Sequence, residues 1–252
     1  MNHRPTTLAF LLIATICLTG GCDSNRADKD TTPADKPADT PETPAEPAVM
    51  TLFDGSSLEG WSGDERFWSV VDGAIVGETT PDNPIERNTF LIWQGGDVDD
   101  FELRFKYRMT GGNSGVQFRS EDKGEFSVAG YQADFDAGNN YTGILYDEGG
   151  GRGILVQRGQ EVTIDEKGEK KVTGTVCDEA EYVAGLNTGD WNEVVVTAKG
   201  NRLSHSINGI TSAVLIDSEE GKAKSSGILA LQLHTGPPMK IEFRDIELVQ
   251  TR

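Results

Sequence analysis

The sequence predicts an all-β domain, built as a sandwich or a barrel. Apolar and polar residues alternate with a period of two in many short segments, which is typical of strands with one buried face. Gly, Asn and Asp pairs that favour tight turns separate these segments, and the chain has 30 Gly. No segment of the domain shows a sustained helical period. Such a fold leaves the outer face of a sheet free to bind a ligand.

The N-terminal part is predicted to stay outside this domain. In residues 1–22 a basic start and a short apolar run end at LTGGC, which resembles a lipoprotein signal peptide with Cys22 as the lipidated residue. Thr19 departs from the motif, because a large aliphatic residue usually stands there. A simple secretory signal cut nearby is the alternative. We expect export and a lipid anchor on a bacterial membrane, at the periplasm or the cell surface.

The next two segments differ sharply in composition. Residues 23–48 are rich in Pro, Ala, Asp and Thr and have too few large apolar side chains to fold, so we expect a disordered tether. Residues 49–252 are then expected to form one β domain.

Charge and cysteine content narrow the classes of function. The net charge is −18, with 41 acidic against 23 basic residues, which argues against nucleic acid or anionic lipid as a partner. Contact with a membrane would therefore come only from the lipid anchor. Cys177 is the single cysteine of the β domain, so neither a disulfide framework nor a zinc motif is expected. We interpret Cys177 as a bystander because no histidine can be placed beside it.

The predicted strands follow one another closely along the domain. A hairpin over 67–77 turns at Asp72-Gly73, the commonest tight-turn pair, and a second hairpin over 162–175 turns at 166–169. Turns are also expected at 200–201 and at Asn208-Gly209. The other expected strands are 89–94, 101–109, 116–119, 130–136, 141–146, 154–157, 191–198, 202–207, 228–234 and 240–249.

The longest alternation lies in residues 100–119, DFELRFKYRMTGGNSGVQFR. Five apolar residues from Phe101 to Met109 alternate with charged ones, and the pattern resumes at Val116. We expect the TGGNSG turn to join two paired strands of one sheet. The charges of the first strand are interpreted as a solvated face.

Three strands place polar residues two positions apart, between strongly apolar ones. If these strands share a sheet, one face carries a carboxylate, an imidazole, a guanidinium and three amides, which suit sugar hydroxyls. Asp134 and His234 could act as general base and acid. A merely solvated face is the alternative, but Gln is not a strong strand former, which favours a site. The residues are Gln117, Arg119, Gln132, Asp134, Gln232 and His234.

The segment DEGGGRG, residues 147–153, is a loop dense in functional groups. It lacks the Lys-Ser/Thr ending of a phosphate-binding loop, so we interpret it as a binding rim. Neighbouring carboxylates could bind a divalent metal, but their spacing matches no metal motif. The rim residues are Tyr146, Asp147, Glu148 and Arg152, and the carboxylates are Asp134, Asp136, Asp147 and Glu148.

Taken in order, several segments resemble the 3-keto-disaccharide hydrolase domain family of exported, often lipid-anchored bacterial proteins, abundant in planctomycetes. The resemblance covers residues 50–251. It implies a concanavalin-like or jelly-roll β-sandwich of two antiparallel sheets. It also implies action on sugars whose 3-hydroxyl a separate sugar 3-dehydrogenase has oxidised. The segments include LFDGSSLEGW, GGNSGVQFR, GYQADFD, YTGILYDEGG and GILALQLHTG.

This substrate class fits the residues found. A 3-ketone acidifies the hydrogen on C2, so a base can remove it, the C1 group leaves by elimination and water adds. An ordinary glycosidase needs two placed carboxylates, and no convincing pair is present. His234 or Asp134 is the expected base, and a metal that stabilises the enolate is left open. The expected binding residues are Asn113, Ser114, Gln117, Arg119, Gln132, Tyr146, Glu148, Arg152 and Gln232, with Tyr146 or Arg152 at the leaving sugar.

Two other classes of function remain open at this point. A non-catalytic carbohydrate-binding module would use the same sandwich to hold sugars without cutting them, and the fold alone does not decide. A cell-surface interaction domain would use the polar face to dock another protein.

Overall fold

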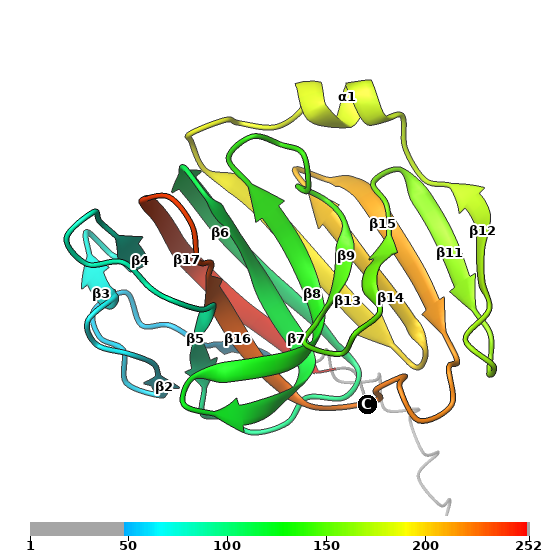
Figure 1. Cartoon of the computed structure of the whole chain (residues 1–252), viewed down its shortest axis with the longest axis horizontal. Coiled ribbons are helices and arrows are strands. Elements are labelled where there is room, and N and C mark those ends of the chain that lie inside the picture. Colours follow the sequence, from blue (N-terminus) through cyan, green and yellow to red (C-terminus); the bar gives the residue numbers. More distant parts are fainter. Residues whose placement is uncertain (1–47, 251–252) are drawn as a thin grey trace, which may run out of the picture. The chain divides into compact units, whose positions relative to one another are not determined.

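The computed structural model describes residues 48–250. The predicted signal peptide, the lipidation site Cys22 and nearly all of the tether lie outside these residues. In the described part, 17 strands form two sheets that face each other, and the short helix α1 (Glu179–Ala184) lies at one end of them (Figure 1). No helix within residues 48–250 is long and apolar enough to cross a membrane.

The larger sheet has ten strands, and nine of them form a continuous row. The tenth, β1 (Val49–Thr51), pairs with the end of β17. In spatial order the row is β12 (Lys170–Thr175), β11 (Gln160–Ile164), β15 (Ile210–Asp217), β14 (Arg202–Ile207), β13 (Asn192–Lys199), β6 (Phe101–Thr110), β17 (Met239–Gln250), β4 (Ala74–Thr79) and β3 (Trp68–Val71).

The smaller sheet has seven strands and carries most of the polar residues that the sequence singles out. In spatial order they are β10 (Gly153–Val156), β9 (Leu145–Glu148), β8 (Ser127–Asp136), β7 (Asn113–Gly124), β16 (Ile228–Leu233), β5 (Thr89–Trp93) and β2 (Trp61–Ser62). All pairs in both sheets are antiparallel except β11 with β15. The predicted β-sandwich of antiparallel sheets is therefore confirmed.

The turns show why the hairpins form where the sequence predicts them. Asp72 and Gly73 between β3 and β4 have φ angles of 50° and 76°, and Asn208 and Gly209 between β14 and β15 have 50° and 79°. Two successive residues with positive φ match the right-handed twist of the flanking strands, and Asn, Asp and Gly tolerate this conformation best.

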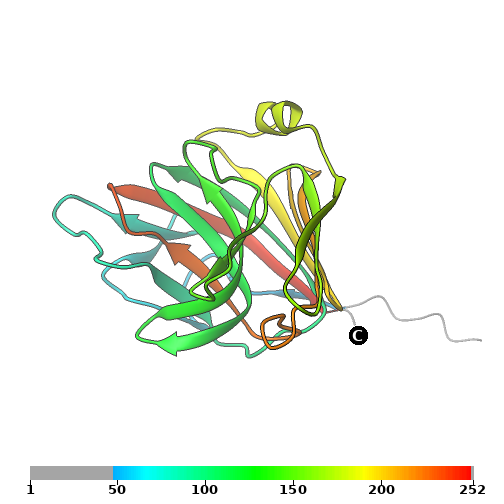
Figure 2. The ribbon, with the colours of Figure 1, turned by 45° about the vertical axis from the view of Figure 1, so that its right-hand side comes forward.

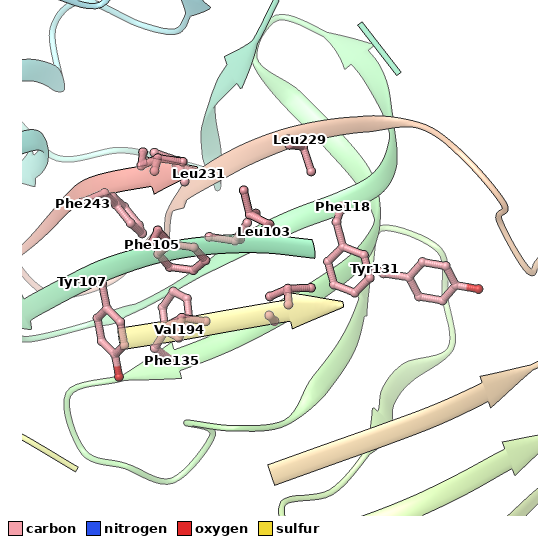
Figure 3. Packing of buried hydrophobic residues seen from close by; sticks show 14 of the residues in the cluster. Leu103, Phe105, Tyr107, Phe118, Tyr131, Phe135, Val194, Leu229, Leu231 and Phe243 are labelled. Carbon is pink, nitrogen blue, oxygen red and sulfur yellow. The ribbon is translucent and has the colours of Figure 1, made fainter. Parts of the chain in front are cut away.

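The core lies between the two sheets and is rich in aromatic rings. Tyr107 of β6 stacks on Phe135 of β8 with ring centroids 4.3 Å apart, and Phe118 stacks on Tyr131 at 5.7 Å (Figure 3). All four rings are buried. The first pair joins the two sheets, and the second joins neighbouring strands of the seven-stranded sheet. Burying each large apolar side chain contributes about 1.5–3 kcal/mol, so these rings help to hold the sandwich together.

One prediction about the centre of the chain is wrong. β6 and β7 do not pair with each other, because β6 lies between β13 and β17 while β7 lies between β8 and β16 in the other sheet. Gly111 and Gly112, both with φ of 67°, carry the chain across from one sheet to the other. Alternation marks which face of a strand is buried, and it does not say whether two such faces lie side by side or across the core.

Two other elements differ from the sequence-based expectation. The strand expected over 141–146 begins only at Leu145, and residues 137–144 form a loop. Helix α1, which no periodicity predicted, starts at the N-cap Asp178, whose carboxylate accepts the Glu181 N–H at 2.9 Å. Six residues are too few to show a helical period. Figure 2 shows α1 again at the end of the strands in a view turned by 45°.

Candidate functional site

The outer face of the seven-stranded sheet is hollowed beside β7, β8 and β9. The hollow has a volume of about 540 Å³, and eleven residues line it. Six of them belong to the set that the sequence predicts: Asn113, Gln132, Asp134, Tyr146, Glu148 and His234. The residues that sequence reasoning missed are Asn88, Tyr141, Ile144, Gly149 and Ile154.

Asp134 is the most perturbed group of this hollow. Its Oδ1 accepts hydrogen bonds from Asn113 Nδ2 at 3.1 Å and from Gln132 Nε2 at 3.2 Å, and no Lys, Arg or His side chain within residues 48–250 forms an ion pair with it. Burial, with a smaller contribution from the nearby Asp136 and Glu148, raises the pKa of Asp134 to about 8, although the hydrogen bonds from the two amides lower it. A carboxyl with such a pKa can hold or release a proton near neutral pH.

A chain of buried amides fixes the side chain of Gln132. Gln117 Nε2 donates to Gln132 Oε1 at 2.5 Å, and Gln132 Nε2 donates to Gln232 Oε1 at 3.2 Å as well as to Asp134. The oxygen of Gln117 is in turn held by Ser120 Oγ at 2.7 Å. Gln117 and Gln232 do not line the hollow. Their hydrogen bonds to Gln132 fix the direction in which its amide points.

A glycine makes room for this arrangement. Gly115 stands directly opposite Asp134 in the pairing of β7 with β8. A Cβ atom at this position would lie 2.6 Å from Gln132 Cγ, which is closer than real Cβ contacts come. The G in the NSGVQFR segment thus serves the site by letting the Gln132 side chain lie across the neighbouring strand.

His234 reaches the hollow from the loop that follows β16. Its Nδ1 lies 2.5 Å from the carbonyl oxygen of Thr235. A carbonyl can only accept, so Nδ1 carries the hydrogen and Nε2 of the neutral ring carries the lone pair. His234 can therefore present a hydrogen-bond acceptor to a ligand.

Asn88 ties two parts of the rim together. Its Oδ1 accepts the Thr235 N–H at 3.0 Å, and its Nδ2 donates to Glu148 Oε1 at 2.9 Å. The loop that carries His234 and the strand that carries Glu148 are thus held in a fixed relation. Nothing in the sequence could have pointed to Asn88, since a single Asn before a strand has many ordinary uses.

Arg119, which the sequence predicts to bind substrate, does not line the hollow. The strand is irregular after Phe118, and Arg119 has a φ of 46°. Its guanidinium is buried and donates to the carbonyls of Asp99 at 2.8 Å and Gly200 at 2.6 Å and to the Asp100 carboxylate at 2.9 Å. The bulge reverses the alternation, so Arg119 no longer shares the face of Gln117.

Ser114 and Arg152 are also placed away from the hollow. Ser114 is fully buried, and its hydroxyl donates to the backbone oxygen of Gln232 at 2.7 Å. Arg152 turns the other way, onto Asp147 at 3.2 Å and Asp217 at 2.6 Å. Both side chains hold parts of the sandwich together rather than meeting a ligand here.

The residues described by the structure do not fit a metal centre. No group of three or more His, Cys, Asp or Glu side chains within residues 48–250 is arranged to hold a metal ion. Of the four carboxylates considered from the sequence, Asp136 accepts backbone N–H groups of its own loop and Asp147 pairs with Arg152. Asp134 and Glu148 are left to line the hollow.

Comparison with protein families identifies the domain. Residues 48–249 match the family of 3-keto-alpha-glucoside-1,2-lyase-like domains. The chain belongs to this family. The resemblance inferred from the sequence segments is therefore confirmed, and the match covers nearly all of the described residues. None of the curated proteins matches this chain.

Solved structures with the same fold come from carbohydrate-related and uncharacterised proteins. A Parabacteroides distasonis protein provisionally assigned as a glycosyl hydrolase has a TM-score of 0.53 at 17% identity, covering 81% of this chain and 100% of its own. The carbohydrate-binding module CBM66 from Bacillus subtilis has a TM-score of 0.50 at 14% identity, and the match covers 76% of this chain and 96% of the module. A protein of unknown function with a galectin-like fold from Bacillus subtilis has a TM-score of 0.53 at 10% identity, and the match covers 81% of this chain and 94% of that protein. At these identities the likeness shows a shared β-sandwich fold.

Proposed function

We propose that this domain cleaves 3-keto-glycosides, including 3-keto-disaccharides, with Asp134 as the base that removes the C2 hydrogen. One observation carries the proposal: a buried carboxyl with its pKa raised to about 8 lines an open polar hollow. A general base works best when its pKa lies near the working pH. The family assignment supports an elimination across C1 and C2 of a 3-keto-glucoside.

The reaction can be written with its atoms balanced. The C2–H bond breaks, its proton goes to the Asp134 carboxylate, and its electron pair joins the C3 ketone as an enolate. The enolate re-forms the ketone and expels the C1 oxygen, which takes up a proton and leaves as an alcohol. Addition of water across the new C1=C2 bond then gives the free 3-keto sugar. A single well-placed base therefore suffices.

The amides around Asp134 have distinct tasks in this mechanism. Each amide nitrogen carries two hydrogens. Gln132 donates both, to Asp134 and to Gln232, so it holds the base in place. Asn113 donates only one to Asp134 and keeps the other for the oxygen that becomes the enolate. His234 Nε2 and the Glu148 carboxylate accept from sugar hydroxyls.

The setting of the reaction is part of the same proposal. A lipid on Cys22 would hold the domain at the bacterial cell envelope, and a separate sugar 3-dehydrogenase would supply the ketone. Carbohydrate is then the partner of the hollow, and the membrane is met through the anchor alone.

A direct assay tests the proposal. Purified protein is incubated with 3-keto-trehalose or 3-keto-lactose, with and without EDTA, and release of free 3-keto-glucose and glucose is measured. We expect release from the 3-keto substrates and none from the unoxidised disaccharides. No release from any 3-keto-glycoside would contradict the proposal, and loss of release in EDTA would show that a metal takes part.

A sugar-binding module without catalysis is the second candidate. The shared fold with the carbohydrate-binding module CBM66 supports it. Such a module would bind unoxidised glycans saturably and release no product, so the same assay combined with a binding titration separates the two functions.

A further inference from the structure

Part of the hollow is apolar and is not used by the chemistry proposed above. Tyr141, Ile144 and Ile154 line it together with the polar groups. Tyr141 is 50% exposed, and among residues 48–250 it is the only aromatic one of the large exposed apolar residues. An aromatic ring left in water beside a polar hollow is available to contact a ligand.

The backbone at Tyr141 is firmly held from within its own loop. Its N–H donates to Asp136 Oδ1 at 2.7 Å, and the same oxygen accepts the Thr142 N–H at 3.2 Å. Thr142 Oγ1 returns a hydrogen bond to the backbone oxygen of Asp136 at 3.0 Å. These bonds close the loop on itself, so the ring is carried by a fixed backbone.

Neighbouring elements support the same loop from outside. Arg158 Nη1 donates to the backbone oxygens of Asn139 at 2.8 Å and Thr142 at 2.9 Å. Gly143, with a φ of 91°, packs against Tyr182 of α1, and a Cβ atom there would lie 2.5 Å from the Tyr182 hydroxyl. Because the backbone is already held, binding a ligand would fix only the side-chain torsions of Tyr141, which lowers the entropic cost.

We infer that Tyr141 is a specificity-determining residue that stacks on the leaving group of the glycoside. The electron-rich face of the ring attracts the C–H groups of a second sugar ring or the edge of an aromatic aglycone. Ile154, which is half-buried, adds apolar surface for the same group. Cyclic leaving groups are then favoured over a short alkyl group. The inference rests on the proposed function for the 3-keto sugar that occupies the polar part.

A kinetic comparison of leaving groups tests this. Methyl 3-keto-α-glucoside and a 3-keto-disaccharide are assayed with wild type, Tyr141→Ala and Tyr141→Phe. We expect Tyr141→Ala to raise KM for the disaccharide about 3–10-fold, the range of one aromatic contact, and to leave the methyl glycoside within about 2-fold. Tyr141→Phe keeps the ring and should behave as wild type. An equal loss on both substrates would overturn the inference.

A binding measurement separates this inference from the proposed function. Isothermal titration with unoxidised p-nitrophenyl and methyl α-glucosides needs no catalysis. We expect wild type to prefer the p-nitrophenyl compound and Tyr141→Ala to lose that preference, with unfolding temperatures showing that the variant is folded. Absence of the preference in wild type overturns the role of Tyr141. Inactivity of wild type on every 3-keto-glycoside overturns the proposed function instead.

Discussion

The outer faces of the two sheets are built from similar residue types and behave differently. On the ten-stranded sheet the charges are paired: Arg108 lies 2.7 Å from Glu242, and Lys106 lies 3.0 Å from Asp245. On the seven-stranded sheet the hydrogen-bond donors to the Asp134 carboxylate, among the residues that the structure describes, are the neutral amides of Asn113 and Gln132. One face neutralises its acids with cations, and the other keeps an acid without one.

The pKa values of the two acids shift in opposite directions for this reason. The hydrogen bond from Arg108 lowers the pKa of Glu242, while burial without a cation raises that of Asp134 to about 8. A carboxylate that is stabilised by arginine is a weak base near neutral pH, whereas a destabilised one is a strong base. The absence of a partner, more than the presence of an acid, therefore distinguishes the candidate site.

The largest expected effect comes from replacing the unpaired acid. Asp134→Asn keeps an oxygen for the two amides and removes the base, so kcat for a 3-keto-disaccharide should fall by about 10²–10⁴. Glu242→Gln is the matched control, since it changes an acid of the other face in the same way, and it should leave kcat within about 2-fold. Comparable losses in the two variants would remove the functional distinction between the faces.

Arg119 tests whether a buried cation of the seven-stranded sheet serves the fold alone. Arg119→Met leaves the carbonyls of Asp99 and Gly200 without their donor and Asp100 without its cation. We expect a loss of about 3–5 kcal/mol in the free energy of unfolding, measured by urea titration. The folded fraction should keep its kcat. A stable variant that has lost activity would instead return Arg119 to the site.

Arg119 also shows how far the sequence could be taken. Alternation identified the strands and buried faces, and Asp72-Gly73 and Asn208-Gly209 located two turns, because these signals are local. A bulge shifts the register by one residue and reverses every side chain that follows, yet it leaves no clear mark in the sequence. The pairing of β6 and β7 was mispredicted for a related reason, since sheet membership depends on partners distant in the chain.

The site was predictable to the same limited extent. Gln132, Asp134 and His234 stood out because polar residues between strong apolar ones need an explanation. Tyr141 was hidden in a segment that resembles a strand, and Asn88 forms no pattern at all. The hydrogen-bond partners of Asn88, Glu148 and Thr235, lie 60 and 147 residues away along the chain, so only the fold reveals these contacts.

A pH profile sharpens the contrast between the two acids. Because the pKa of Asp134 is raised from 3.8 to about 8, the base form is depleted about tenfold for each pH unit below 8, and kcat/KM should rise with pH and level off above pH 8. The same shift has the opposite sign for stability. Between pH 4 and 8 the folded state holds a proton that the unfolded state releases. As the pH rises through this range, the free energy of unfolding of wild type should therefore fall, relative to that of Asp134→Asn, by up to about 1.4 kcal/mol per pH unit. A plateau of activity below pH 5 would contradict both the base and its environment.

The smallest expected effect lies on the outer face of the ten-stranded sheet. This prediction depends most directly on the difference between the outer faces of the two sheets. Arg104 lies 2.6 Å from Glu102 on β6, and their side chains are 50% and 31% exposed. Solvent screens such a pair, so Arg104→Ala should change the free energy of unfolding by no more than about 0.5–1 kcal/mol and leave kcat/KM unchanged. In the sequence Glu102 and Arg104 stand between apolar neighbours just as Gln132 and Asp134 do, so the alternation by itself does not separate the two pairs, and the residue types were the reason to interpret the first pair as solvated. A loss of activity in Arg104→Ala would place substrate contacts on the ten-stranded sheet, whereas a silent variant restricts them to the face on which an acid is buried among amides.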